Sequence, residues 1–162
     1  NLSLDKFKYS FNRILFATQP YGVEDNYKII SCLLEITTSD HQVIIRRHPR
    51  DTIDYKVRFP TVEYDNITDA IESIACSGIV LSKTSTILQD CYNLGVPYVA
   101  VLFDDFSRTL DLLFTKIKGN FCIDEEGLGM LINAYLEKPY KERISVFNKP
   151  KPLKKIRKEL LL

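Results

Sequence analysis

The stretch SGIVLSKTSTILQDCYNLGVPYVAVLFD, residues 77–104, contains one complete strand–helix–strand unit. Residues 77–83 (SGIVLSK) form a short apolar run without polar alternation, which predicts a strand covered on both faces. Residues 85–95 follow as a helix that ends at Gly95. Residues 97–104 (PYVAVLFD) are almost all apolar and predict a second covered strand. Because covered strands joined through a helix pair in parallel, this unit predicts a parallel sheet with helices packed on it.

The same alternation extends in both directions along the chain. We expect further strands at 13–18, 42–47, 57–63 and 120–124, and further helices at 25–37, 66–76, around 107–117 and at 125–137. Asp25 and either Asn66 or Thr68 are the expected helix caps, and Pro60 places 57–63 near a sheet edge. The sequence therefore predicts an α/β, Rossmann-like doubly wound domain over residues 1–147. Its sheet is mainly parallel with helices on both faces, and residues 148–162 form a basic tail or helix.

Composition narrows the functional classes. The chain has 162 residues, which suits one domain, and begins at Asn1, so we expect it to be part of a longer protein. No apolar run reaches the roughly 20 residues that span a bilayer, and no signal-peptide pattern is present, so we expect a cytoplasmic protein. The net charge of +1 gives no indication of nucleic-acid binding, and we expect no nucleic-acid partner. Four scattered cysteines and two histidines predict reduced thiols and no metal site.

A basic turn with a histidine follows the strand at 42–47. Ligands bind beyond the carboxyl ends of parallel strands, so this loop belongs to the predicted ligand edge. Arg46 and Arg47 end the strand, and His48 is followed by Pro49, which stiffens the turn. An imidazole held there can donate to a phosphate oxygen, and guanidinium groups can add charge-assisted hydrogen bonds. The alternative interpretation is a surface turn with solvated arginines.

A second phosphate-binding loop is predicted after the strand at 77–83. The sequence SKTST (82–86) places Ser85 or Thr86 at the start of the next helix. One hydroxyl is explained by capping, but several hydroxyls, a lysine (Lys83) and free amide groups at a helix N-terminus also form an anion site. Neither a GxGxxG fingerprint nor a P-loop occurs, because the first loop, TQPYGVED (18–25), has a single glycine.

Other polar residues at strand ends have less specific roles. Asp104 and Asp105 could bind ribose or sugar hydroxyls, or Asp105 could cap a helix. Glu63, Asp65 and Asn66 are candidates for contact with a nucleobase. Residues 149–158 carry the basic side chains of the tail. They form either a solvated amphipathic helix or a weak contact with the anionic inner face of a membrane, where the protein would be peripheral.

The motifs RRHP (46–49), ITDAIESIACSGIVLSKTST (67–86) and ILQDCYNLGVPYVAV (87–101) together resemble the C-terminal, donor-binding half of GT-B glycosyltransferases. The likeness is closest to bacterial enzymes that use cytidine-activated donors. These are sialyltransferases, polysialyltransferases and CDP-glycerol glycerophosphotransferases. In those families a His-Pro pair and a Ser/Thr pair face the donor phosphate, which assigns that role here to His48, Pro49, Ser85 and Thr86. The chain has SKTST where the CDP-glycerol group has an Asp-Tyr-Ser-Ser pattern, which favours the sialyltransferase-like alternative.

The resemblance implies the donor-nucleotide-binding domain of an inverting, metal-independent glycosyltransferase. It would use a CMP-activated sugar in bacterial surface polysaccharide or lipooligosaccharide synthesis. His48, helped by Arg46 or Arg47, would be catalytic by neutralising the leaving phosphate. No metal or other cofactor is implied beside the nucleotide-sugar substrate. The glycan acceptor and the general base would come through a missing N-terminal domain. Two alternatives remain open: one half of a GT-B-type sugar-nucleotide epimerase, and a non-catalytic α/β interaction module.

Overall fold

The computed structural model describes residues 10–83, 85–104 and 121–138, which form one α/β sandwich. Their parallel sheet has the order β3-β2-β1-β4-β5-β6, the doubly wound order of a Rossmann fold, which confirms the predicted fold class. The strands are β1 (Ser10–Ala17), β2 (Gln42–Arg46), β3 (Glu63–Tyr64), β4 (Ser77–Ser82), β5 (Tyr98–Val101) and β6 (Phe121–Cys122). The helices are α1 (Val23–Ile36), the 3-10 helix η2 (Tyr55–Val57), α2 (Ala70–Ala75), α3 (Thr86–Leu94) and α6 (Glu125–Leu136).

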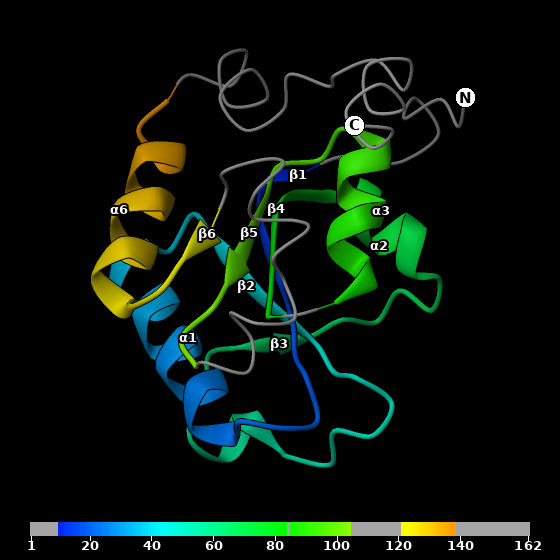
Figure 1. The fold of residues 1–162 in the computed structure, drawn as a ribbon, viewed down its shortest axis with the longest axis vertical. Helices are drawn as coiled ribbons and strands as arrows, with labels where there is room; N and C mark the ends of the chain where they lie inside the picture. Colours follow the sequence, from blue (N-terminus) through cyan, green and yellow to red (C-terminus); the bar gives the residue numbers. More distant parts are fainter. Residues whose placement is uncertain (1–9, 84, 105–120, 139–162) are drawn as a thin grey trace, which may run out of the picture.

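Helices cover both faces of the sheet. Figure 1 shows α1 and α6 together on one face and α2 and α3 on the other. Side chains alternate between these layers, because successive residues of a strand point to opposite faces. In β1, Ile14 and Phe16 join the core under α1 and α6, whereas Leu15 and Ala17 join the core under α2 and α3. Residues 14–17 of β1, residues 79–81 of β4 and the whole of β5 are therefore apolar at every position, as the continuous runs in the sequence predict.

The prediction of a strand at 57–63 is wrong for most of that segment. Residues 55–57 form the 3-10 helix η2, and the chain then turns, with Phe59 N–H donating to Tyr55 O at 2.9 Å and Val62 N–H to Phe59 O at 3.2 Å. Only Glu63 and Tyr64 pair with β2. Turn hydrogen bonds have replaced a sheet ladder, so the apolar residues of this segment pack from a loop.

Two predicted helix caps are also corrected. The helix α1 begins after Gly22, whose φ of 63° lies in the left-handed region, and Asp25 lies inside its first turn. The N-cap of α2 is Asp69 instead of Asn66 or Thr68, and its carboxylate accepts from Glu72 N–H. In contrast, Ser85 and Gly95 bound α3 as predicted.

Some predictions fall on other parts of the chain. The helix near 107–117, the residue Asp105 and the basic tail at 148–162 lie outside the described residues. Within residues 10–83, 85–104 and 121–138, no helix has the length and apolar character needed to cross a bilayer. The predicted contact between residues 149–158 and a membrane surface therefore stays a prediction.

A buried carboxylate ties three elements together at the end of β3. Asp65 has a side chain that is 1% exposed and forms ion pairs with Arg13 of β1 and Arg46 of β2. It also accepts hydrogen bonds from the Ser73 hydroxyl and from Ile67 N–H at 3.1 Å. Such a pair is costly to break, because removing one partner leaves the other charge buried and uncompensated.

We predict that Asp65→Asn lowers the free energy of unfolding by about 3–5 kcal/mol. The substitution removes the negative charge that both arginines face. The new NH₂ group is a donor, so it would meet donors whose hydrogen bonds the carboxylate accepts in the wild type. Urea denaturation of the two proteins measures the difference. Asp69→Asn is the matched control four residues away, since asparagine caps a helix as well as aspartate does. An equal effect of both substitutions would contradict a central role for Asp65.

The same carboxylate predicts a pH dependence of stability. Burial alone would raise the pKa of Asp65, but hydrogen bonds from Ser73 and Arg46 outweigh burial and hold that pKa below its ordinary value. A lowered pKa in the folded state stabilises the fold above the unfolded pKa of about 3.9, and this stabilisation is lost as pH falls through the folded pKa. The stability gap between the wild type and Asp65→Asn should therefore narrow below about pH 4. A difference in unfolding free energy between the two proteins that stays constant from pH 6 to pH 3, measured in urea titrations, would contradict this pH dependence.

Candidate functional site

The carboxyl ends of three neighbouring strands define the candidate site. The sheet register pairs Ala17 of β1 with Arg46 of β2 on one side and with Ser82 of β4 on the other. These three residues therefore lie in one row across the sheet, with neighbouring strands about 4.8 Å apart. Between β1 and β4 the strand order reverses, which is where open α/β sheets form a ligand crevice. The loops that carry His48 and Ser85 both start from this row, on either side of β1.

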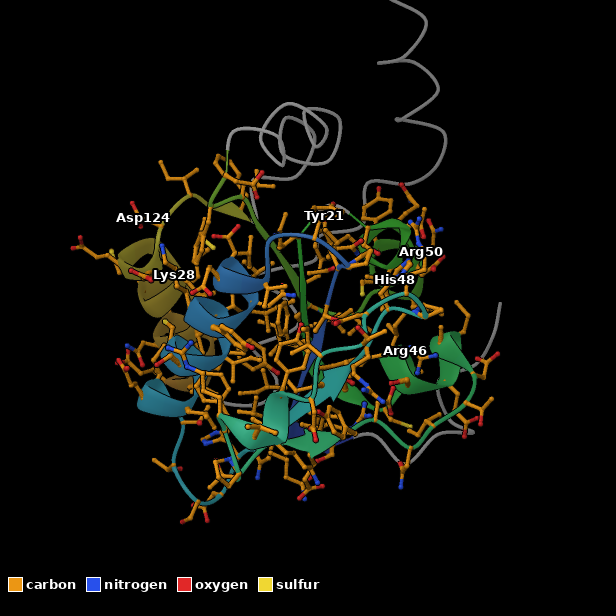
Figure 2. The ribbon with its side chains drawn as sticks, turned by 90° about the horizontal axis from the view of Figure 1, so that it is seen from below. Tyr21, Lys28, Arg46, His48, Arg50 and Asp124 are labelled. Carbon is orange, nitrogen blue, oxygen red and sulfur yellow. The ribbon has the colours of Figure 1, made fainter. Side chains whose placement is uncertain are left out.

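His48 lies in a tight turn that directly follows β2. Asp51 N–H donates to His48 O at 2.8 Å, which closes a four-residue turn with Pro49 at its second position, where proline is favoured. The backbone N–H of His48 donates to the Thr18 hydroxyl at 3.2 Å, and its Nδ1 accepts from Arg50 N–H at 3.1 Å. Figure 2 views the molecule from the edge where the strands end. His48 and Arg50 lie there on the side of the sheet that carries α2 and α3.

The two arginines before His48 turn to other partners. Arg46 donates to Asp65, to Ile67 O at 2.8 Å and to Thr68 O at 3.0 Å, so its guanidinium lies against the loop before α2. Arg47 is exposed, and its guanidinium lies 4.7 Å from the centre of the Tyr64 ring. The structure therefore brings His48 and Pro49 to the edge but directs Arg46 toward Asp65 and Arg47 toward Tyr64. Direct phosphate contact by either arginine stays a prediction.

The N-terminus of α3 meets the other side of the row. Ser85 is its N-cap, and the Ser85 hydroxyl accepts from Ile87 N–H at the long distance of 3.4 Å. Thr86 follows as the first helical residue and is exposed. The first turn of α3 contains no acidic residue, so the positive end of its dipole is not neutralised by its own side chains. This helix end therefore has the properties of an anion site.

Lys83 does not take part in that anion site, which corrects the prediction from SKTST. Its side chain is 1% exposed, and its ammonium lies 3.3 Å from Asp25 Oδ2 and 3.7 Å from Asp104 Oδ2. The ammonium also donates to Tyr21 O at 3.2 Å and to Gly22 O at 3.4 Å. Lys83 lies two residues after Leu81, and residues two apart in a strand point to the same face of the sheet. Because Leu81 packs under α1 and α6, Lys83 points toward α1 and away from α3.

Gly22 is required for the Lys83 ion pair for two reasons. Its φ of 63° is a conformation that a side chain disfavours. A Cβ at this position would also overlap the Lys83 ammonium, so the backbone can approach that group only without a side chain. The glycine, the lysine and Asp25 together tie the first loop to the end of β4, and Asp104 adds the end of β5.

A buried polar group under the His48 turn was not predicted from the sequence. Asp51 is 8% exposed, and Oδ2 of its carboxylate accepts from the Thr18 hydroxyl and from the Tyr55 hydroxyl. The signal that could have revealed it is the position of Asp51, which closes the HPRD turn with a residue that often bonds to nearby backbone. Thr18 at the end of β1 gave a weaker signal of the same kind.

The predicted nucleoside contacts lie further along the edge. Glu63 and Asn66 are exposed, on and directly after β3, two strands away from β1. A pocket of about 260 Å³ lies between β2 and β3, lined by Ile45, Arg46, Arg47, Tyr64, Asp65 and Ile67. A larger hollow of about 570 Å³ lies between α1 and α6, and no predicted site residue lines it. Asp65 is the exception among the candidates, because its side chain is 1% exposed and paired with Arg13 and Arg46, which does not leave it open to a nucleobase. Asp104 faces Lys83. Sugar contact by Asp104 and nucleobase contact by Glu63 or Asn66 stay predictions.

The thiols of this domain are poor candidates for chemistry. The four cysteines are free, and burial raises the pKa of Cys122 to about 12, with the neighbouring Cys32 and Asp124 adding to it. Burial and the carboxylates of Glu35 and Glu125 raise the pKa of Cys32 to about 11. Within the part of the chain that the structure describes, no group of three or more histidines, cysteines or acids is arranged to hold a metal ion.

Several solved structures share this fold, whereas no protein-family model and no curated protein sequence matches the chain. The UDP-GlcNAc 2-epimerase of Methanocaldococcus jannaschii, in complex with UDP-GlcNAc and UDP, has a TM-score of 0.56 and 18% identity. Its match covers 99% of this chain and 49% of the epimerase. The wall teichoic acid polymerase TagF has a TM-score of 0.59 and 16% identity, over 98% of this chain and 48% of the polymerase.

A third neighbour is the UDP-GlcNAc 2-epimerase of Neisseria meningitidis bound to UDP-GlcNAc. It has a TM-score of 0.59 and 19% identity, over 97% of this chain and 45% of the epimerase. At these identities the likeness shows a common fold, that of a Rossmann-like domain of the GT-B architecture. The chain spans less than half the length of each of these three neighbours.

The close approach of Gly22 to Lys83 predicts unequal effects of two glycine substitutions. Gly95 has a φ of 75° with open space around a new Cβ, so Gly95→Ala should cost only the left-handed conformation, about 1–2 kcal/mol. Gly22→Ala should cost more than this, because the Lys83 ammonium must also shift away from the new Cβ and from its carboxylates. Urea denaturation of both variants measures the difference. Equal losses of stability would show that the ammonium does not depend on Gly22.

Proposed function

We propose that this domain binds the phosphate of a nucleotide-sugar donor, as one half of a GT-B glycosyltransferase. The single observation that carries the proposal is the register row through Arg46, Ala17 and Ser82. From it, the His48 turn and the N-terminus of α3 rise on either side of the point where the strand order reverses. Both offer hydrogen-bond donors, and neither has a carboxylate of its own in the way, since Asp51 is buried under the turn.

The chemistry of the proposed site is electrostatic. His48 would donate from Nε2 to an oxygen of the phosphate, and Ser85 and Thr86 would bind it through hydroxyls and free amide groups. Charge builds on this phosphate as the glycosidic bond breaks, so donors held in place before the reaction stabilise the transition state. Arg50, next to His48 in Figure 2, can add positive charge at the rim. In this proposal the charge on the leaving group is stabilised by hydrogen bonds from His48 and from α3, without a metal or an organic cofactor.

The structural neighbours support a nucleotide ligand of this kind. Two are epimerases solved with UDP-GlcNAc, and TagF structures include a soak with CDPG. Because this chain spans less than half of their length, a second domain would complete the site. We propose that this second domain binds the glycan acceptor and supplies the general base. The cytidine-activated donor, the inverting course of the reaction and the role in surface polysaccharide synthesis are parts of the proposal that derive from the resemblance of the motifs.

One alternative function has specific support. The M. jannaschii and N. meningitidis epimerases have the same fold, so a donor-binding half of a sugar-nucleotide epimerase is the second candidate. The two candidates differ in the base that the domain should prefer. A cytidine nucleotide fits the transferase, and a uridine nucleotide fits the epimerase.

We predict that the full 162-residue chain binds CMP or CDP more tightly than UDP or GDP in calorimetric titrations. His48→Ala should weaken this binding by about 10- to 150-fold, the effect of losing one hydrogen bond to a charged group. Ser85→Gly should also weaken it, since glycine retains most of the cap but lacks the hydroxyl.

The second histidine provides the matched control. His41 lies at the other end of β2, with Nδ1 near Thr38, so His41→Ala should leave nucleotide affinity unchanged. A preference for UDP would favour the epimerase alternative. No binding of any nucleotide at millimolar concentration would reject the proposed function of this domain and favour the interaction module.

A further inference from the structure

We infer that Asp51 is a positioning residue for His48, because its buried carboxylate fixes the turn that orients the imidazole and leaves the ring proton on Nε2. The inference rests on the proposed function, in which that proton is offered to the phosphate. Asp51 lies in the loop between β2 and η2, yet it is only 8% exposed. A carboxylate in a surface loop normally remains in water, so its burial requires compensating hydrogen bonds.

Three donors converge on this carboxylate. Oδ2 accepts from the Thr18 hydroxyl and from the Tyr55 hydroxyl, the latter at 2.8 Å. Oδ1 accepts from Ile53 N–H at 3.1 Å. The donors come from the end of β1, from η2 and from the loop itself, so one side chain fixes the position of the His48 turn relative to the sheet.

The charge of Asp51 sets the direction of the hydrogen bonds around it. An ionised carboxylate only accepts, so the Thr18 hydroxyl must give its proton to Asp51. The Thr18 oxygen is then left to accept from His48 N–H, at 3.2 Å. The backbone N–H of Asp51 donates to His48 O at 2.8 Å. Both backbone polar groups of His48 are therefore held, one through Thr18 and one directly by Asp51.

The far side of the group reinforces this direction. The amide of Asn26, on α1, donates to the Tyr55 hydroxyl at 2.8 Å and to Gln19 O at 3.2 Å. Burial raises the pKa of Tyr55 above its ordinary value, and the hydrogen bond to Asp51 adds to this, so Tyr55 stays protonated as a donor. The hydrogen bonds from Asn26 to Tyr55 and from Tyr55 to Asp51 thus both run toward Asp51.

The held turn determines which ring nitrogen of His48 carries the proton. Arg50 N–H points at Nδ1 of His48 from within the same turn, at 3.1 Å. A nitrogen that accepts carries no proton, so the neutral imidazole is protonated on Nε2. Phosphate oxygens accept hydrogen bonds, and Nε2 is the ring nitrogen further from the backbone. Asp51 acts on the phosphate only through this geometry and has no direct contact with it in the proposal.

The test is the tautomer of His48 in the full chain, measured by long-range ¹H–¹⁵N correlation at about pH 8, where an ordinary imidazole is neutral. We expect the wild type to have an unprotonated Nδ1 and a protonated Nε2. Asp51→Asn should give a mixture of tautomers, because an amide cannot accept from both hydroxyls and from Ile53 N–H without opposing one donor. A wild-type ring protonated on Nδ1 would overturn the inference.

Three further variants keep the test meaningful if Asp51→Asn does not fold. Thr18→Val has the shape of threonine without the hydroxyl and should shift the tautomer, whereas Thr18→Ser should restore the wild-type signal. Asp54→Asn is the matched control, because Asp54 is an exposed aspartate three residues on that caps η2 and contacts Tyr64. A wild-type tautomer in Thr18→Val, or the same shift in Asp54→Asn, would overturn the role of Asp51.

Nucleotide affinity separates this inference from the proposed function. If both hold, Thr18→Val weakens CMP or CDP binding by about tenfold, the value of one hydrogen bond, and Thr18→Ser does not. If the wild type binds no nucleotide but its tautomer responds to Asp51 and Thr18 as expected, the positioning role stands and the proposed function fails. If nucleotide binds and these variants change neither affinity nor tautomer, the proposed function stands and the positioning role fails.

Discussion

The alternation of side chains along the parallel strands is the constraint on which the rest of this structure depends. Both faces of the sheet are buried, so the alternation fixes which residues pack under α1 and α6 and which pack under α2 and α3. It continues past the last ladder pair. Arg46, in the last ladder pair, turns to the loop before α2, whereas Thr18 and Lys83, one residue beyond that row, turn to the side of α1. The same period that builds the core therefore sorts the polar residues at the ligand edge.

This sorting makes the two helix ends at the crevice electrically different. The first turn of α1 contains Glu24 and Asp25, and the ammonium of Lys83 is held against Asp25 and against the backbone of the first loop. The first turn of α3 has no acid, and its cap is the neutral Ser85. An anion that enters between β1 and β4 therefore meets one helix end that already carries carboxylates and one that offers free donors. This difference is why the proposed phosphate site lies at α3.

Sequence patterns predicted those parts of the fold that local chemistry decides. The covered strands β1, β4 and β5 and the helix α3, with Ser85 and Gly95 at its ends, follow from apolar runs and caps. The prediction of a strand at 57–63 was wrong because the apolar residues of this segment lie in turns. The hydrogen bonds of those turns leave no periodic pattern in the sequence. Lys83 was assigned to the wrong side because the local sequence does not show which face of the sheet α1 covers and which face α3 covers. The role of Asp51 depends on Thr18, 33 residues earlier, and only the sheet brings the two together.

In the proposed function, a site built in this way would recognise a phosphate by the direction of its hydrogen-bond donors more than by net charge. The chain has a net charge of only +1, Lys83 is paired inside the domain, and Arg46 is paired with Asp65. Beside the exposed Arg47 and Arg50, the edge offers donors whose positions are fixed by their own backbone, namely the His48 turn and the first turn of α3. Donors fixed in advance lose little entropy on binding and favour a group with acceptors at matching positions. A buried carboxylate such as Asp51 is well suited to that arrangement, because it orders a neutral imidazole without placing a negative charge in the phosphate's path.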